Sequence, residues 1–128
     1  MPDPSPEPKT VLVVEDQNVV RRMVARALEE EGYRVLEASD GEQALELLSR
    51  GPRVDLVVSD VVMPNMGGFV LAERLLLGGE PPIFLFITGY DQDPTKVPGP
   101  LLQKPFTPTE LVAEVKRLMA QAVRSGEP

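Results

Sequence analysis

Short apolar runs alternate along this chain with segments of helical periodicity, and this alternation constrains the fold more than any other feature. The run Val11–Val14 is apolar at consecutive positions, as expected for a parallel strand that is covered on both faces. Apolar residues then recur at helical spacing between Val20 and Leu28, and the stripe ends at Gly32. Repetition of such units predicts an α/β fold with a parallel sheet.

The same alternation continues toward the C-terminus. We expect four further strands, at residues 34–38, 55–59, 83–88 and 101–103. The second helix should begin after an N-cap pair formed by Asp40 and Gln43, and the third should run from about Phe69 to Leu77. Thr107-Pro108-Thr109-Glu110 opens the last helix, because Thr caps, Pro occupies the first helical position and Glu reaches back.

One connection breaks this rhythm. Residues 89–100 contain three prolines and two glycines and have no helical stripe. Crossovers between parallel strands usually carry a helix. We therefore expect a loop or a stunted helix between the fourth and fifth strands.

Size and composition limit the classes of function that this chain can have. Its 128 residues with 42% apolar content suit one folded domain. We place a flexible Pro-rich leader at residues 1–9, the domain at 10–123 and a flexible tail at 124–128. Cys and His are absent, which excludes disulfides, thiol chemistry, imidazole-bound zinc and His-based acid–base catalysis.

Charge and hydropathy bear on partners and location. The formal net charge of -7 disfavours direct contact with nucleic acid. No apolar stretch approaches the ~20 residues that a membrane helix needs, and the N-terminus does not resemble a signal peptide. We expect no membrane insertion, and the lack of disulfides is consistent with the cytoplasm.

Polar side chains follow the expected strands at the points where the strands end. Glu15 and Asp16 follow the first apolar run, Asp60 the third and Thr88 the fourth, while Lys104 comes after the short run Leu101–Leu102. Strand ends in an open parallel sheet converge on one crevice, where ligands bind. Three carboxylates, a hydroxyl and an ammonium in one crevice indicate a site for a divalent cation and a phosphoryl group.

Each of these residues also has a purely structural alternative. Asp60 could be a helix N-cap, Glu15-Asp16 a solvated loop pair, Thr88 an ordinary β-branched strand residue and Lys104 a surface lysine. All four alternatives would have to hold together to remove the site. An Asp-dependent phosphatase would normally need a second acid two residues after the nucleophile, where this chain has a valine.

Between residues 10 and 122 the chain resembles a two-component response-regulator receiver domain. The resemblance rests on Glu15-Asp16, on Asp60 before Met63-Pro64-Asn65-Met66-Gly67, on Thr88 and on Lys104-Pro105-Phe106. It implies a flavodoxin-like, doubly wound sheet of five parallel strands in the order 2-1-3-4-5, here with a truncated or missing fourth helix. The Leu-Leu-Gln-Lys-Pro-Phe stretch is similar to that of receivers attached to hybrid histidine kinases, and a single-domain regulator is the other form that we consider.

The resemblance also implies roles for the site residues. Asp60 is the phospho-acceptor, Thr88 the switch hydroxyl and Lys104 the cation for a phosphoryl oxygen. Mg²⁺ is held directly by Asp16, Asp60 and the Val62 carbonyl, and by Glu15 through water. Pro105 sets loop geometry, through a cis bond as in the family.

The implied function is that of a signalling receiver in a phosphorelay. It accepts a phosphoryl group from a histidine kinase or phosphotransfer protein and then presents a changed surface to a downstream protein that the sequence does not identify. It turns over no external metabolite and is therefore not an enzyme. The alternative is a pseudo-receiver, an interaction module that keeps the fold without using phosphorylation.

Three positions bear on how a receiver of this sequence would switch and how long it would stay phosphorylated. Leu101 stands where many receivers have an aromatic residue that follows the switch hydroxyl, so the usual coupling and output face are in question. Val62 and Tyr90 lie two residues after Asp60 and Thr88, and neither is suited to orient an attacking water. We expect slow self-dephosphorylation, with Tyr90 shielding the site, binding a partner or replacing the switch aromatic.

Overall fold

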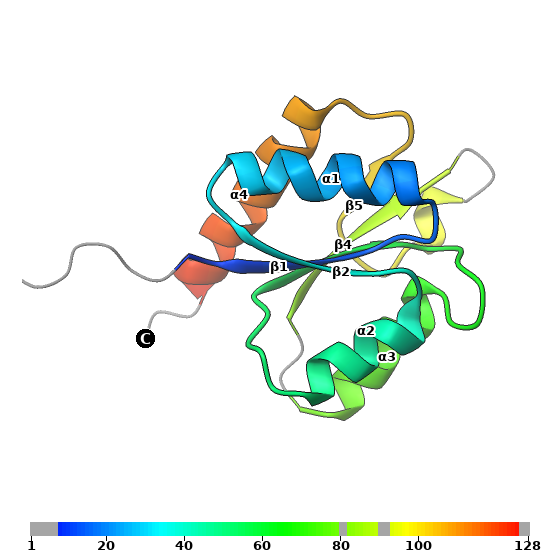
Figure 1. Cartoon of the computed structure of the whole chain (residues 1–128). Helices are drawn as coiled ribbons and strands as arrows, with labels where there is room; N and C mark the ends of the chain where they lie inside the picture. The colour runs from blue at the N-terminus through cyan, green and yellow to red at the C-terminus, as the bar shows by residue number, and fades with distance from the viewer. Residues whose placement is uncertain (1–7, 80–81, 90–92, 126–128) are drawn as a thin grey trace, which may run out of the picture.

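The strands form a parallel sheet in the order β2-β1-β3-β4-β5 in the computed structural model, which describes residues 8–79, 82–89 and 93–125 (Figure 1). The strands are β1 (Thr10–Val14), β2 (Arg34–Ala38), β3 (Leu56–Asp60), β4 (Ile83–Thr88) and β5 (Leu101–Gln103). The helices are α1 (Asn18–Glu30), α2 (Gly41–Ser49), α3 (Gly68–Leu77), η1 (Pro94–Lys96) and α4 (Pro108–Ser125). This is the flavodoxin-like order that the family resemblance implies.

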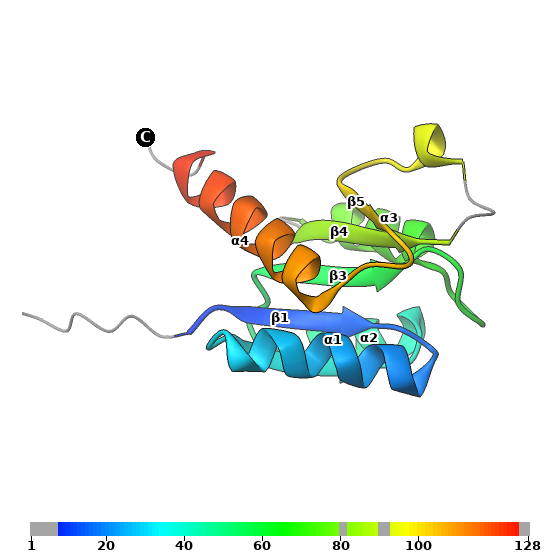
Figure 2. The same cartoon turned by 90° about the horizontal axis from the view of Figure 1, so that it is seen from above.

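Helices cover both faces of the sheet. Helices α1 and α4 lie on one face, and α2 and α3 lie on the other (Figures 1 and 2). Side chains alternate between the two faces along each strand, so that Val11 and Val13 pack toward α1 and α4 while Leu12 and Val14 pack toward α2 and α3. The central strands β1 and β3 are buried throughout, which explains their continuous apolar runs.

Two helices begin with the capping pairs that the sequence predicts. The Asp40 carboxylate accepts a hydrogen bond from the Gln43 amide at 2.9 Å, and the Gln43 side chain accepts one from the Ser39 amide at 2.9 Å. At α4, the Glu110 amide donates to Thr107 Oγ1 at 3.1 Å, and the Thr107 amide donates to Glu110 Oε1 at 2.8 Å. Each pair satisfies backbone donors that a helix N-terminus leaves free.

Element boundaries differ slightly from the expected ones. Strand β3 includes Asp60 itself, and α3 begins one residue early, at Gly68. Helix α4 continues to Ser125, two residues past the domain end expected at residue 123. Most of the expected leader and the last three residues of the expected tail lie outside the described residues. No helix in the described part of the chain combines the length and apolar character needed to cross a bilayer.

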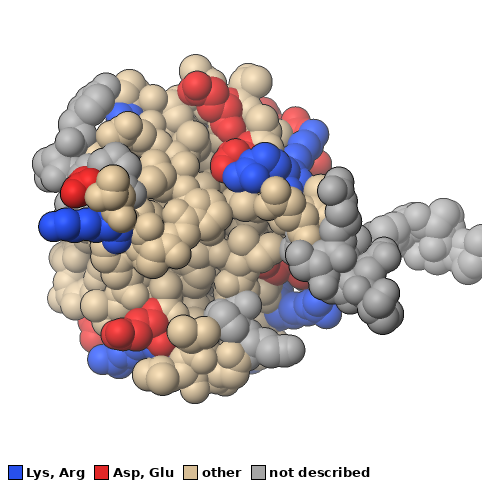
Figure 3. Space-filling view, turned by 180° about the vertical axis from the view of Figure 1, so that it is seen from behind, with Lys and Arg blue, Asp and Glu red and all other residues tan. Residues whose placement is uncertain are grey.

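The connection between β4 and β5 contains only the three-residue 3-10 helix η1 in its described part. This agrees with the stunted helix expected from its prolines. Figure 2 shows that η1 stands at the side of the molecule that carries β5. Figure 3 views the molecule from behind, and its charged side chains lie toward the margins of that face.

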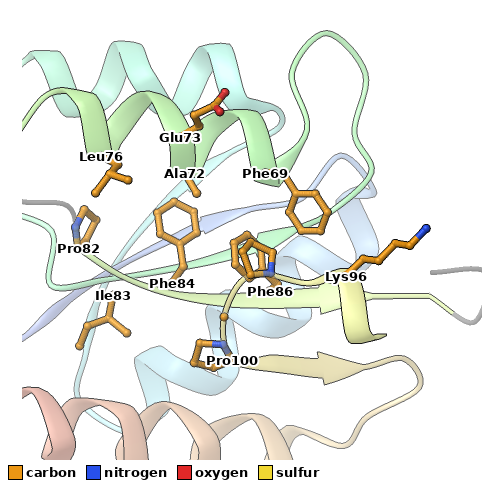
Figure 4. Close-up of a pocket in the computed structure, with 12 residues that line it drawn as sticks. Phe69, Ala72, Glu73, Leu76, Pro82, Ile83, Phe84, Phe86, Lys96 and Pro100 are labelled. Atoms are coloured by element: carbon orange, nitrogen blue, oxygen red, sulfur yellow. The ribbon is translucent and has the colours of Figure 1, made fainter. Parts of the chain in front are cut away.

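Near η1 the α3 side of the sheet carries an apolar groove of about 530 Å³ (Figure 4). Phe69, Ala72 and Leu76 line it at helical spacing along α3, and Phe84 and Phe86 line it from β4. These two rings stack, with centroids 5.3 Å apart. The groove thus occupies the part of the helix layer that a full-length crossover helix would fill.

Candidate functional site

The polar residues predicted from the sequence meet at the carboxyl edge of the sheet. Glu15 directly follows β1, Asp60 and Thr88 are the last residues of β3 and β4, and Lys104 directly follows β5. Strand register places these ends level, because Asp60 pairs with Ile87. The structure therefore brings the predicted site residues to one edge, as the parallel topology requires.

Three carboxylates form the centre of this site. Glu15, Asp16 and Asp60 each offer an oxygen, and these oxygens all lie within 4.8 Å of one another. Glu15 is fully buried and Asp60 is 7% exposed, whereas Asp16 is exposed. Several hard oxygen donors that converge beside solvent are the ligand set that Mg²⁺ prefers.

Lys104 neutralises part of this negative charge. Its Nζ lies 3.0 Å from Asp60 Oδ2 and 3.3 Å from Glu15 Oε1. Burial alone would lower the pKa of the Lys104 ammonium, but the Asp60 and Glu15 carboxylates outweigh it and raise that pKa above its usual value. Lys104 is therefore a fixed cation at this site rather than a free surface lysine.

The buried carboxyl group of Glu15 is the site group whose negative charge is least compensated by its surroundings. Burial raises the pKa of its carboxyl to about 7; the Gln17 amide opposes this shift, and the neighbouring Asp60 carboxyl adds to it. The Gln17 amide donates to Glu15 Oε2 at 2.9 Å. Glu15 Oε1 is buried and makes an ion pair with Lys104 at 3.3 Å, but it accepts no hydrogen bond of good geometry within the described residues. A dication would supply the missing positive charge, so these side chains fit Mg²⁺.

The two oxygens of Asp60 are held in different ways. The Val62 amide donates to Oδ1 at 3.2 Å, and Lys104 Nζ donates to Oδ2 at 3.0 Å. Asp60 does not cap α3, which begins at Gly68, so the structural alternative considered for it is wrong. The role of the Val62 carbonyl as a metal ligand stays a prediction.

Thr88 and the segments beside it complete the site. The Thr88 hydroxyl is fully buried, and Oγ1 has no hydrogen-bond partner among the described residues. The peptide bond Lys104-Pro105 is cis, as expected from the resemblance. Leu101 is half-buried in β5. Tyr90 lies outside the described residues, so its expected role stays a prediction.

Sequence reasoning missed the residues that support the site from behind. Arg21 Nη1 donates to the Glu15 carbonyl oxygen at 2.9 Å. Asn65, in the left-handed conformation at φ 69°, donates its side-chain amide to Asp40 Oδ2 at 2.9 Å and so ties the loop after Asp60 to α2. Periodicity gives no signal for such contacts, because each joins two segments that are separate in the sequence.

Comparisons with known proteins match most of this chain to one family. Residues 11–116 match the family model for the response regulator receiver domain. The sensor kinase CckA from Brucella abortus is 41% identical over 117 residues, which are 86% of this chain and 12% of that kinase. The response regulator receiver protein CpdR from the same organism is 35% identical over 121 residues, 89% of this chain and 99% of that protein.

Solved structures agree with this match. The crystal structure of the receiver domain from the hybrid histidine kinase CckA has a TM-score of 0.73 and 33% identity, covering 86% of this chain and 98% of that one. The chain spans only about half the length of other curated relatives, 51% and 53% in two cases. Activities of those longer proteins therefore extend beyond what this chain covers.

Proposed function

This chain belongs to the response regulator receiver domain family of two-component systems, and on that premise we propose that Asp60 accepts a phosphoryl group. The donor is the phosphohistidine of a histidine kinase or phosphotransfer protein, and the reaction depends on Mg²⁺. One observation carries the proposal: Asp60 Oδ2 lies 3.0 Å from the Lys104 ammonium, beside the carboxylates of Glu15 and Asp16.

The transfer is a displacement at phosphorus. A carboxylate oxygen of Asp60 attacks the phosphorus atom and forms a new O–P bond, giving an acyl phosphate. The N–P bond to the donor imidazole breaks, and the imidazole leaves with that electron pair. Positioning and charge neutralisation dominate the rate of such a step.

The residues of this chain supply most of that neutralisation. Lys104 offers its ammonium to a phosphoryl oxygen, and the buried Thr88 hydroxyl is available to donate to another. Asp16, Asp60 and the Val62 carbonyl would hold Mg²⁺ directly, and Glu15 through water. The ion, when bound, offsets the negative charges of the carboxylates and the incoming phosphoryl group.

The output is a change of surface rather than a chemical product. A phosphoryl group adds charge and acceptor oxygens that can bias a local two-state element. We propose that a downstream protein reads this change, that no external metabolite is turned over, and that the protein is therefore not an enzyme. Its net charge of -7 supports partners other than nucleic acid, and we place it in the cytoplasm.

A pseudo-receiver is the second candidate, and the η1 segment favours it. A receiver normally changes surface through its fourth crossover, and here the described part of that crossover has only three helical residues. Such a module would keep the fold and bind its partner without phosphorylation. The intact set of site residues argues for the first candidate.

Incubation with acetyl phosphate and Mg²⁺ separates the two candidates. The wild-type chain should gain the mass of one phosphoryl group, and Asp60→Asn should not. Asp93→Asn is a matched control, because Asp93 is an exposed aspartate beside η1. A mass gain that persists in Asp60→Asn would overturn the site. No gain in the wild type, together with no spectral response to beryllofluoride, would favour the pseudo-receiver.

A further inference from the structure

Arg21 on α1 joins three parts of the molecule that meet behind the acidic site. Its Nε donates to Glu37 Oε1 on β2 at 3.2 Å, Nη1 donates to the Glu15 carbonyl at 2.9 Å, and Nη2 donates to Asn18 Oδ1 at 2.6 Å. The Arg21 side chain is only 16% exposed. A planar guanidinium can make these three contacts at once, and a lysine ammonium cannot reproduce their geometry.

The contact to the Glu15 carbonyl fixes one peptide plane of the site. The Glu15 amide donates to the Ala38 carbonyl at 3.1 Å, so β2 holds the nitrogen side of this residue. Arg21 holds its carbonyl side, which is the peptide bond between Glu15 and Asp16. The orientation of both acidic residues therefore depends on this pair of contacts.

Asp16 depends on this backbone support more than its neighbours do. Asp60 is held by Val62 and Lys104, and Glu15 by Gln17 and Lys104. Asp16 is exposed, and its carboxylate makes no side-chain hydrogen bond within the part of the chain that the structure describes. The backbone that carries Asp16 sets where its side chain begins and which way its Cα–Cβ bond points.

We propose that Arg21 is a positioning residue for the divalent cation, acting through the Glu15–Asp16 peptide bond that its guanidinium fixes. This inference rests on the proposed function, because it concerns the same cation. Partners behind the ligands of a metal site typically change its affinity by about 10–100-fold when they are removed. Among the described residues the Arg21 side chain hydrogen-bonds to no ligand side chain, so its positioning effect on the cation acts through the backbone.

Arg22 provides a matched control on the same helix. Its side chain is 61% exposed and also pairs with Glu37, but within the described residues it makes no hydrogen bond or ion pair with Glu15 or Asp16. Replacing either arginine by methionine removes one positive charge. Loss of a positive charge near an acidic site should by itself strengthen cation binding. A charge effect would therefore tighten Mg²⁺ binding in both variants, whereas loss of positioning would weaken it in Arg21→Met and not in Arg22→Met.

The test is calorimetric titration of the full chain with Mg²⁺. We expect the Mg²⁺ dissociation constant to rise about tenfold in Arg21→Met, to rise less in Arg21→Lys, and to stay unchanged or fall in Arg22→Met. In the metal-free protein, the backbone amide NMR signals of Asp16 and Gln17 should move in Arg21→Met and not in Arg22→Met. Urea unfolding without metal checks that each variant is folded. If Arg21→Met does not fold, the comparison is made with Arg21→Lys instead.

The outcomes separate this inference from the proposed function. If the wild type and Arg21→Met bind Mg²⁺ equally while the wild type accepts a phosphoryl group, the positioning role is wrong and the function stands. Equal weakening in Arg22→Met would also overturn the positioning role, because it would show an effect that does not need the contact to the Glu15 carbonyl. If the wild type binds no Mg²⁺, both fail.

Discussion

The backbone amide of Lys104 donates a hydrogen bond to the carbonyl oxygen of Thr88 across 2.8 Å. This contact extends the ladder between β4 and β5, in which Thr88 pairs with Gln103. It joins the backbones of the two residues at the carboxyl edge of the sheet, although they belong to different strand–loop segments. The two residues assigned to the phosphoryl oxygens are thus linked through their backbones.

We expect Lys104→Met to slow phosphoryl acceptance without weakening cation binding. Removing a charge-stabilising donor typically slows such a step by about 100-fold. Mg²⁺ binding should be kept or strengthened, because in the wild type the Lys104 ammonium competes with the cation for the carboxylates of Glu15 and Asp60. The rate of acyl phosphate formation from acetyl phosphate measures the first effect, with Lys96→Met on exposed η1 as the control. Equal rates in wild type and Lys104→Met would remove Lys104 from the mechanism.

Thr88→Val should separate stability from signalling. The Thr88 hydroxyl is buried without a partner among the described residues, so replacing it by a methyl group of similar shape should leave the free energy of unfolding unchanged or raise it by about 1 kcal/mol. NMR shifts induced by beryllofluoride should shrink, since the hydroxyl can no longer donate to the bound group. A marked loss of stability would instead mean that the hydroxyl already has a partner.

The raised pKa of Glu15 predicts a pH-dependent stability in the absence of metal. Its carboxyl has an ordinary pKa of 4.5 and a pKa of about 7 in the folded protein, chiefly because of burial. The folded state therefore holds this proton more tightly than the unfolded state. The associated stability is complete below about pH 4.5 and is lost as the pH rises to about 7, by up to about 3 kcal/mol.

Urea unfolding in a chelator at pH 5 and pH 8 measures this effect. Other groups also titrate over this range, so the informative quantity is the difference between wild type and Glu15→Gln. We expect the wild type to lose stability relative to Glu15→Gln as the pH rises, and Mg²⁺ at pH 8 to restore it. A difference that does not vary with pH would show that Glu15 titrates normally.

Most of the site could be predicted from the sequence, because strand ends are set by local patterns. Asp60 and Thr88 each end an apolar run, and a parallel sheet brings such ends together whatever the loops do. The crossover with η1 was also predictable, since prolines exclude a long helix. Strand order came from the family resemblance, because the spacing of the runs does not fix it.

The environment of each site residue could not be predicted in the same way. From the sequence, Glu15 and Asp16 could also have been a solvated loop pair. In the structure Glu15 is fully buried, and its Oε1 lies 3.3 Å from Lys104 Nζ. This contact depends on how β1 and the end of β5 pack across the sheet. The support of the Glu15 carbonyl by Arg21 likewise depends on how α1 lies against β1 and β2.

Gly68 offers a test of how closely α3 is packed against the end of β3, where Asp60 lies. A Cβ atom at this position would lie 2.5 Å from the Asp60 carbonyl oxygen and 3.0 Å from Ser59 Oγ. Gly68→Ala must therefore move the start of α3 or the end of β3. We expect a loss of about 1–3 kcal/mol in the free energy of unfolding, measured in urea.

Gly78 at the other end of α3 is the matched control. A Cβ there would come no closer than 3.6 Å to the Leu75 carbonyl oxygen, an ordinary contact, and its φ is -84°. Gly78→Ala should change stability by no more than about 0.5 kcal/mol. Because the atom closest to the new Cβ belongs to Asp60, we expect Mg²⁺ affinity also to fall in Gly68→Ala and not in Gly78→Ala. Equal stability and equal Mg²⁺ affinity of the two variants would mean that α3 can shift without disturbing Asp60.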